Sequence, residues 1–122
     1  METTERRLEY YFTADGRVPY REWFDSLKER KTKQRIDARL AHVRAGNLGV
    51  HRTVGEGVTE LILDFGPGYR LYFGQVGATI VVLLCGGDKS TQHKDIETAH
   101  TYWVDYRRRH AQDTTQLSRR PP

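Results

Sequence analysis

The sequence predicts a single α+β domain, in which an antiparallel sheet is packed by an N-terminal helical hairpin and followed by a C-terminal helix. Three observations predict this fold. An aromatic stretch near the start of the chain is followed by two stretches whose apolar residues recur at helical spacing. Three apolar stretches with short glycine-containing links come next, as in consecutive antiparallel strands. A last helical stretch completes an order that is typical of α+β domains.

The first third of the chain predicts one strand and two helices. Residues 8–12, Leu-Glu-Tyr-Tyr-Phe, are rich in aromatic side chains and alternate loosely, as in a strand. Pro19 then stands where a first helical position is expected. The apolar positions that follow at helical spacing are Tyr20, Trp23, Phe24 and Leu27. A second helix is expected from about Lys33 to Ala45, with Gly46 as its C-cap, and the two form the predicted hairpin.

The remainder predicts the sheet, the last helix and a tail. Strands are expected at residues 60–65, 69–76 and 79–85, and the last is apolar on both faces and should be central. Residues 47–57 are expected to form a loop with a short strand at most. Ser90 or Thr91 can cap a final helix. Residues 1–110 are therefore the predicted domain, and residues 111–122 a flexible tail.

The composition limits the classes of protein to which this chain can belong. The 122 residues are 37% apolar and 30% charged, as in an ordinary soluble domain. The single cysteine, Cys85, allows no internal disulfide and no cysteine pair for zinc, so we expect no metal and no cofactor. No apolar stretch approaches the roughly 18 residues of a membrane span, and the N-terminus lacks a signal-peptide core. We therefore expect a cytoplasmic protein that does not enter a membrane.

Positive charge is concentrated in two blocks. Residues 28–44 hold seven Lys or Arg against two acidic residues, and the segment from Val104 onward holds five Arg against two Asp. Such blocks are often solvated helix faces and tails. Two blocks on a near-neutral body also suit a polyanion or an acidic protein as partner.

Arg70 and Lys89 are the candidate anion ligands. Arg70 lies in an otherwise apolar and aromatic strand, where its charge must meet solvent, a carboxylate or an anionic ligand. A cross-strand pair with Glu60 or Asp64 is one alternative, and an anion site is the other. Lys89 follows two glycines and precedes a helix start, which suits either an anion or an ordinary strand-to-helix corner. Neighbouring strands would bring the two cations together around a phosphate.

His93 is the candidate proton-transfer group. It would sit in the first turn of the last helix, and histidine titrates near neutral pH. The alternative is an exposed histidine without a role. Tyr72 and Asp95 are other candidates for the same task.

Two segments carry a family resemblance. Residues 65–73, Phe-Gly-Pro-Gly-Tyr-Arg-Leu-Tyr-Phe, and residues 83–92, Leu-Leu-Cys-Gly-Gly-Asp-Lys-Ser-Thr-Gln, resemble the RelE/ParE toxins. Within that superfamily they are similar to the addiction-module killer, or phage Gp49-like, proteins. The likeness extends from about Trp23 to Trp103. It implies a RelE-like fold and a toxin of a type II toxin–antitoxin pair.

The resemblance also implies an activity and partners. Relatives of this kind cleave mRNA without a metal at the ribosome and are held by a cognate antitoxin, a small helix-turn-helix protein. It implies that Arg70 and Lys89 stabilise the phosphate charge and that His93 moves a proton. The residues expected to contact RNA are Lys33, Arg35, Arg39 and Tyr72.

One departure leaves two rival functions open. The branch usually has Glu-Leu-Arg-Ile before the Gly-Pro-Gly turn, whereas this chain has Glu60-Leu61-Ile62-Leu63, so a site cation is replaced by Ile62. This predicts weaker or redirected activity. The rivals are a ParE-like inhibitor of DNA gyrase and a toxin-derived binding module without activity.

Overall fold

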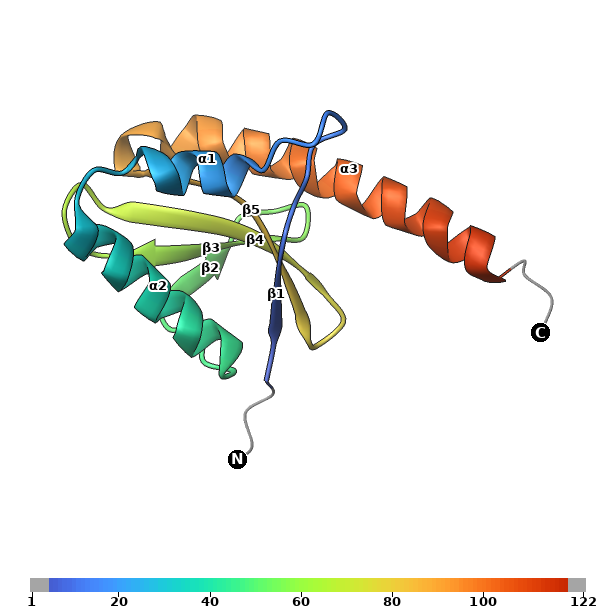
Figure 1. Ribbon diagram of the computed structural model, residues 1–122, viewed down its shortest axis with the longest axis horizontal. Coiled ribbons are helices and arrows are strands. Elements are labelled where there is room, and N and C mark those ends of the chain that lie inside the picture. Colours follow the sequence, from blue (N-terminus) through green and yellow to red (C-terminus); the bar gives the residue numbers. More distant parts are fainter. Residues whose placement is uncertain (1–4, 119–122) are drawn as a thin grey trace.

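A computed structural model describes the backbone of residues 5–118 and the side chains of residues 5–111. A five-stranded sheet lies between two helices on one face and one long helix on the other (Figure 1). The elements are, in order, β1 (Arg7–Tyr10), α1 (Pro19–Ser26), α2 (Arg30–Arg44), β2 (His51–Thr53), β3 (Val58–Leu63), β4 (Tyr69–Val76), β5 (Ile80–Asp88), a short 3-10 helix η1 (Lys89–Thr91) and α3 (Gln92–Ser118).

The sheet is mixed, with the strand order β1-β5-β4-β3-β2. Strands β2 to β5 pair antiparallel, as consecutive strands joined by short links do. Strand β1 pairs with β5 in parallel, with Arg7 opposite Ile80 and Tyr10 opposite Leu83. The start of the domain is therefore tied to the strand that directly precedes η1 and α3.

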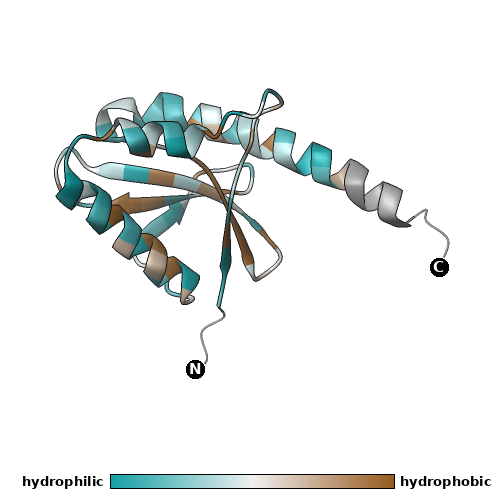
Figure 2. Ribbon diagram, viewed as in Figure 1, coloured by the Kyte–Doolittle hydropathy of each residue, from teal (hydrophilic) through white to brown (hydrophobic). Residues whose placement is uncertain are grey.

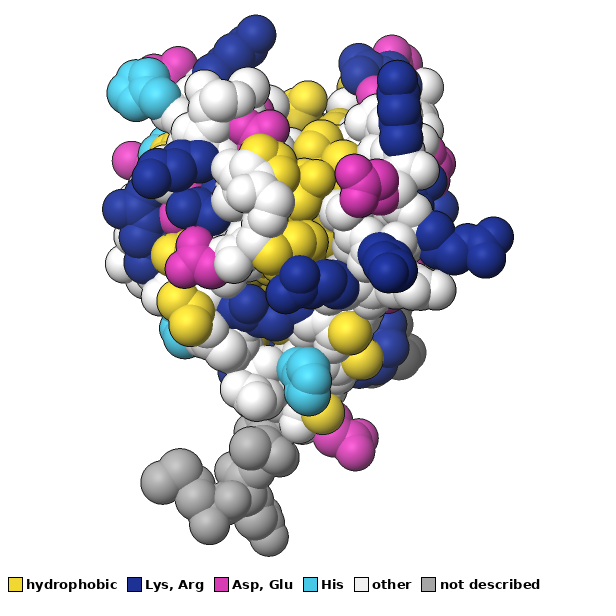
Figure 3. Space-filling model, turned by 90° about the vertical axis from the view of Figure 1, so that its left-hand side faces the viewer, with side chains coloured by type: hydrophobic (Ala, Val, Ile, Leu, Met, Phe, Trp, Pro, Cys, Tyr) yellow, Lys and Arg dark blue, Asp and Glu magenta, His cyan; other side chains and the backbone are white. Residues whose placement is uncertain are grey.

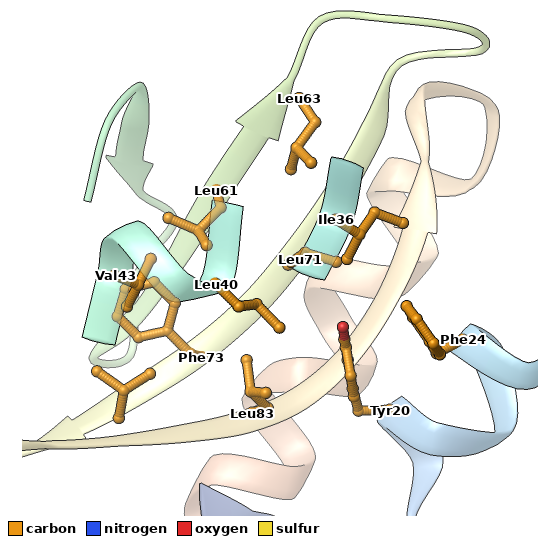
Figure 4. Packing of buried hydrophobic residues seen from close by; sticks show 11 residues of the cluster. Tyr20, Phe24, Ile36, Leu40, Val43, Leu61, Leu63, Leu71, Phe73 and Leu83 are labelled. Carbon is orange, nitrogen blue, oxygen red and sulfur yellow. The ribbon is translucent and has the colours of Figure 1, made fainter. Parts of the chain in front are cut away.

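Two separate apolar clusters hold the layers together. Hydrophobic residues are concentrated in β3, β5 and part of β4, as Figure 2 shows. On one face, Ile36, Leu40 and Val43 of α2 point toward strand residues, and α1 adds Tyr20 and Phe24 (Figure 4). On the other face, α3 buries Ala99, Trp103 and Tyr106 against β3, β4 and β5. Alternate residues of β3, β4 and β5 contribute to the two clusters, as the pleat requires.

Each of two glycines lets one tryptophan ring lie directly on the sheet. A Cβ added at Gly74 of β4 would come within 2.4 Å of the Trp103 ring. On the opposite face, a Cβ at Gly86 of β5 would come within 2.3 Å of the Trp23 ring. Both helices therefore approach the strands closely because these two positions carry no side chain.

The fold predicted from the sequence is wrong in two respects. The sheet is not antiparallel throughout, because the N-terminal segment forms a strand that pairs in parallel with β5. The helices α1 and α2 are not a hairpin packed on the sheet as one unit: α1 contacts mainly β5, and few contacts join it to α2. The parallel pairing joins residues about 70 positions apart, and no local pattern in the sequence signals it.

Individual elements agree with the local patterns to differing degrees. β4 has the predicted bounds, whereas β5 continues through both glycines to Asp88. The helix α3 continues to Ser118, and residues 119–122 of the predicted tail lie outside the described part of the chain. The flexibility of residues 111–122 stays a prediction. No helix within residues 5–118 has both the length and the apolar character of a membrane span.

Candidate functional site

Arg70 is the central residue of the candidate site. It lies near the start of the central strand β4, opposite Ile62 of β3 and Gly87 of β5. Only 8% of the residue is exposed. Its Nη1 donates to the carbonyl of Tyr69 at 3.0 Å, and its buried Nε has no hydrogen-bond partner. A guanidinium with unused donors in such a place suits a bound anion.

The alternative for Arg70, a cross-strand ion pair, is not formed with any carboxylate among the described side chains. Glu60 accepts from other donors, and Asp64 is exposed in the turn after β3. The charge of Arg70 is therefore left uncompensated by its own chain in residues 5–111.

Lys89 lies beside Arg70 at the end of the sheet. A Cβ added at Gly68 would be 3.4 Å from both the Arg70 Nη1 and the Lys89 Cβ, so the two cations flank this glycine. Lys89 begins η1 and is exposed. The corner is held by Asp88, whose side chain accepts from the backbone N–H of Ser90 at 2.8 Å. Hydrogen bonds from Ser90, chiefly from its hydroxyl group and also from its backbone N–H, lower the pKa of Asp88.

A buried carboxylate, Glu60, lies beneath the start of α3 and accepts a hydrogen bond from its first residue. Glu60 of β3 is fully buried and accepts hydrogen bonds from Arg52 Nε at 2.7 Å, Tyr72 Oη at 2.9 Å and Gln92 Nε2 at 2.9 Å. Burial by itself would raise the pKa of Glu60, but the hydrogen bonds from Arg52, Gln92 and Tyr72 outweigh it and the pKa is lowered. Because Gln92 is the first residue of α3, this network fixes the helix start relative to β3 and β4.

A second acidic group lies between α3 and β5. A Cβ at Gly87 would come within 1.9 Å of the Asp95 Oδ2, so this carboxyl group rests on the glycine that pairs with Arg70. Thr91 Oγ1 donates to Asp95 at 2.5 Å. Burial raises the pKa of Asp95 in spite of that hydrogen bond. The raised pKa brings the group closer to the range in which a carboxyl group exchanges protons during catalysis.

Two residues expected from the sequence are not in contact with this site. The side chain of His93 is 96% exposed and lies 3.5 Å from Glu97, its neighbour one turn along α3. Tyr72 is fully buried beneath α3, and burial together with Glu60 raises the pKa of its phenol well above the usual value. In this conformation the Tyr72 side chain has no exposed surface that RNA could contact.

The three cations expected on α2 have different surroundings. The Arg35 guanidinium stacks on Phe65, 3.7 Å from the ring centroid, and the Lys33 Nζ lies 5.7 Å from the Phe24 centroid. The Arg39 guanidinium donates to the carbonyls of Leu48, Val50 and Ile62. Arg39 therefore joins α2 to the segment before β2 and to β3, and these donors are already in use.

Arg39→Ala is expected to lower the free energy of unfolding by about 2 kcal/mol, because charge-assisted hydrogen bonds to several carbonyls are lost at a partly exposed position. Urea unfolding measures the change. Lys31→Ala, an exposed lysine on the same helix, is the matched control and should stay within about 0.5 kcal/mol of the parent. Equal stability of both variants would contradict the structural role of Arg39.

Sequence reasoning did not single out Glu60, Gln92 or Arg52 as a network. The available signal was a lone carboxylate within the apolar strand 58–63, which must find donors if it is buried. Its donors come from β2, β4 and α3, and only the folded chain brings these together. Among the described residues, no group of three or more His, Cys, Asp or Glu side chains could hold a metal ion.

No model of a known protein family matches the chain, and no solved structure matches it. An uncharacterized protein of Haemophilus influenzae is 46% identical to it over 77 residues, which are 63% of this chain and 78% of that protein. The chain belongs to the same family as this Haemophilus influenzae protein.

Proposed function

We propose that the protein is a toxin of a type II toxin–antitoxin pair that cleaves mRNA at the ribosome without a metal ion. The observation that carries this proposal is the buried guanidinium of Arg70, which has unused donors and no carboxylate partner, beside the exposed Lys89. Two adjacent cations at the open end of a sheet suit the phosphate of an RNA chain. The resemblance of residues 65–73 and 83–92 to RelE/ParE toxins supports the same activity.

In the proposed reaction the ribose 2′-oxygen attacks the adjacent phosphorus, and the bond to the 5′-oxygen of the next nucleotide breaks. The products are a 2′,3′-cyclic phosphate and a 5′-hydroxyl, so one proton leaves the 2′-oxygen and one reaches the 5′-oxygen. Arg70 and Lys89 stabilise the charge that develops on the phosphate oxygens. Asp95 is better placed than His93 to exchange a proton, because it lies over Gly87 next to Arg70.

The proposal includes partners and a location. A cytoplasmic toxin of this kind would meet mRNA and ribosomal RNA with the basic face of α2, where Lys33 and Arg35 lie. Its cognate antitoxin would be a small helix-turn-helix protein with acidic side chains for the Arg70 and Lys89 corner.

One observation favours the alternative of a ParE-like DNA gyrase inhibitor. Ile62 lies directly opposite Arg70 in the sheet, where a second site cation is expected. A protein that inhibits gyrase by binding needs no such cation.

Expression of the protein alone is expected to arrest growth, and co-expression of the small protein encoded next to it should restore growth. Mapping of mRNA ends after induction should then show new 5′-hydroxyl ends within minutes. Intact mRNA together with induced DNA-damage signalling would instead identify gyrase as the target. Normal growth with abundant, folded protein would exclude a toxin.

A further inference from the structure

We propose that Trp23, Phe65 and Tyr69 form a stacking platform for unpaired bases of single-stranded RNA, at the same end of the sheet as the phosphate site. This inference rests on the proposed function and adds a base-binding subsite to it. The three rings come from α1, the β3–β4 turn and the start of β4, and all are partly exposed. We call this set the aromatic platform.

The rings form a continuous series. The Trp23 and Tyr69 centroids are 6.2 Å apart at an interplanar angle of 65°, and the Tyr69 and Phe65 centroids are 5.3 Å apart at 54°. Trp23 is held against β5 because Gly86 leaves space for its indole. The platform is therefore built on the rigid sheet, as a binding site for planar groups requires.

Arginine side chains lie against the aromatic platform and the neighbouring Phe24. Arg35 stacks on Phe65 at 3.7 Å, and on the neighbouring Phe24 ring the Arg21 guanidinium lies 5.0 Å from the centroid. Figure 3 looks onto the end of the molecule where the β3–β4 turn, the α1–α2 link and the start of α3 meet. It shows a hollow lined by hydrophobic side chains and bordered on both sides by Lys and Arg together with Asp and Glu. Aromatic rings between cations are the combination that binds single-stranded nucleic acid.

The platform and the phosphate site lie at the same end of β4, on either side of the sheet. Tyr69 precedes Arg70, and its carbonyl accepts the hydrogen bond from the Arg70 Nη1. Tyr69 also lies opposite Asp88, the residue before Lys89. The side chains of Tyr69 and Arg70 point to opposite faces of the sheet, so a nucleotide whose phosphate is held by Arg70 and Lys89 reaches the platform with an adjoining base only by passing around the start of β4. This charge pattern favours RNA over an apolar peptide as the occupant.

Intrinsic fluorescence tests the platform with two defined probes. The first is a hexaribonucleotide with 2′-O-methyl groups, which cannot be cleaved, and the second is an abasic oligonucleotide of the same length and charge. The chain has two tryptophans, and Trp103 is only 3% exposed, so quenching by a stacked base reports on Trp23. We expect the hexamer to quench the emission and to bind at least about 10-fold more tightly than the abasic probe.

Matched variants locate the site. Phe65→Leu and Tyr69→Leu should each weaken hexamer binding about 10-fold and leave binding of the abasic probe unchanged. Phe12→Leu, an exposed aromatic away from the hollow, should bind both probes like the parent. Thermal melting checks that each variant is folded. Tyr69→Phe, which keeps the aromatic ring, should bind the hexamer as tightly as the parent does.

The outcomes separate this inference from the proposed function. Equal affinity for the two probes, or wild-type KM for RNA cleavage in folded Phe65→Leu and Tyr69→Leu, would overturn the platform while cleavage itself stands. Base-dependent quenching by a protein that cleaves no RNA would support the platform and overturn the nuclease. Quenching by an apolar helical peptide, with none by the hexamer, would identify a protein-docking surface and overturn the platform.

Discussion

Arg70→Met is expected to lower the rate of RNA cleavage by about 100- to 1000-fold, which is the usual effect of removing one group that stabilises transition-state charge. The fold should be at least as stable as the parent. The guanidinium is buried, its Nε lacks a partner, and no described carboxylate neutralises it. Methionine fills a similar volume and carries no charge, so a desolvated charge is removed at little cost in packing.

Single-turnover cleavage of a model RNA and urea unfolding measure the two effects. Arg107→Met, at an exposed arginine whose guanidinium lies 5.9 Å from the Trp103 ring centroid, is the matched control for the rate and should leave it unchanged. Arg70→Lys should recover only part of the rate, because lysine lacks the forked donors of arginine. A folded Arg70→Met variant with full activity would show that the phosphate is held elsewhere.

Glu60→Ala is expected to lower the free energy of unfolding by about 3 kcal/mol. The substitution leaves the Tyr72 hydroxyl and the Gln92 amide without their acceptor and opens a cavity between β3 and α3. Urea unfolding measures the loss. Arg52→Ala removes the half-exposed partner of the same carboxylate and should cost at most about 1 kcal/mol. Similar losses in the two variants would contradict the view that burial makes Glu60 the centre of the network.

The same carboxylate predicts how stability depends on pH. Burial opposes ionisation of Glu60, but hydrogen bonds from Arg52, Gln92 and Tyr72 outweigh it, so the folded pKa lies below the value of 4.5 expected for the unfolded chain. Ionised Glu60 therefore stabilises the fold above that value, and the contribution is lost as the pH falls through the folded pKa. The urea midpoint of the parent should fall more steeply than that of Glu60→Gln between about pH 5 and pH 3. Parallel curves would contradict this linkage.

The features that the sequence predicted correctly depend on residues that are close together in the chain. The strand at residues 69–76 and the Gly-Pro-Gly turn depend on neighbouring residues, and the pattern of glycines and apolar residues was sufficient for both. The proximity of Arg70 and Lys89 followed from two strands joined by a tight link. The sequence could not predict that Arg70 lacks a carboxylate partner among the described side chains, because Glu60 is engaged by donors from three other elements.

The sequence by itself determined the local elements of the sheet, the position of the two candidate phosphate ligands and the basic character of α2. These depend on residue type and short spacing, which are local properties. Only the tertiary structure decided that β1 pairs in parallel with β5, that Arg39 serves backbone carbonyls, and that His93 faces solvent while Asp95 lies beside Arg70. Each of these depends on which distant segments meet, and that is set by the packing of whole layers around two apolar clusters.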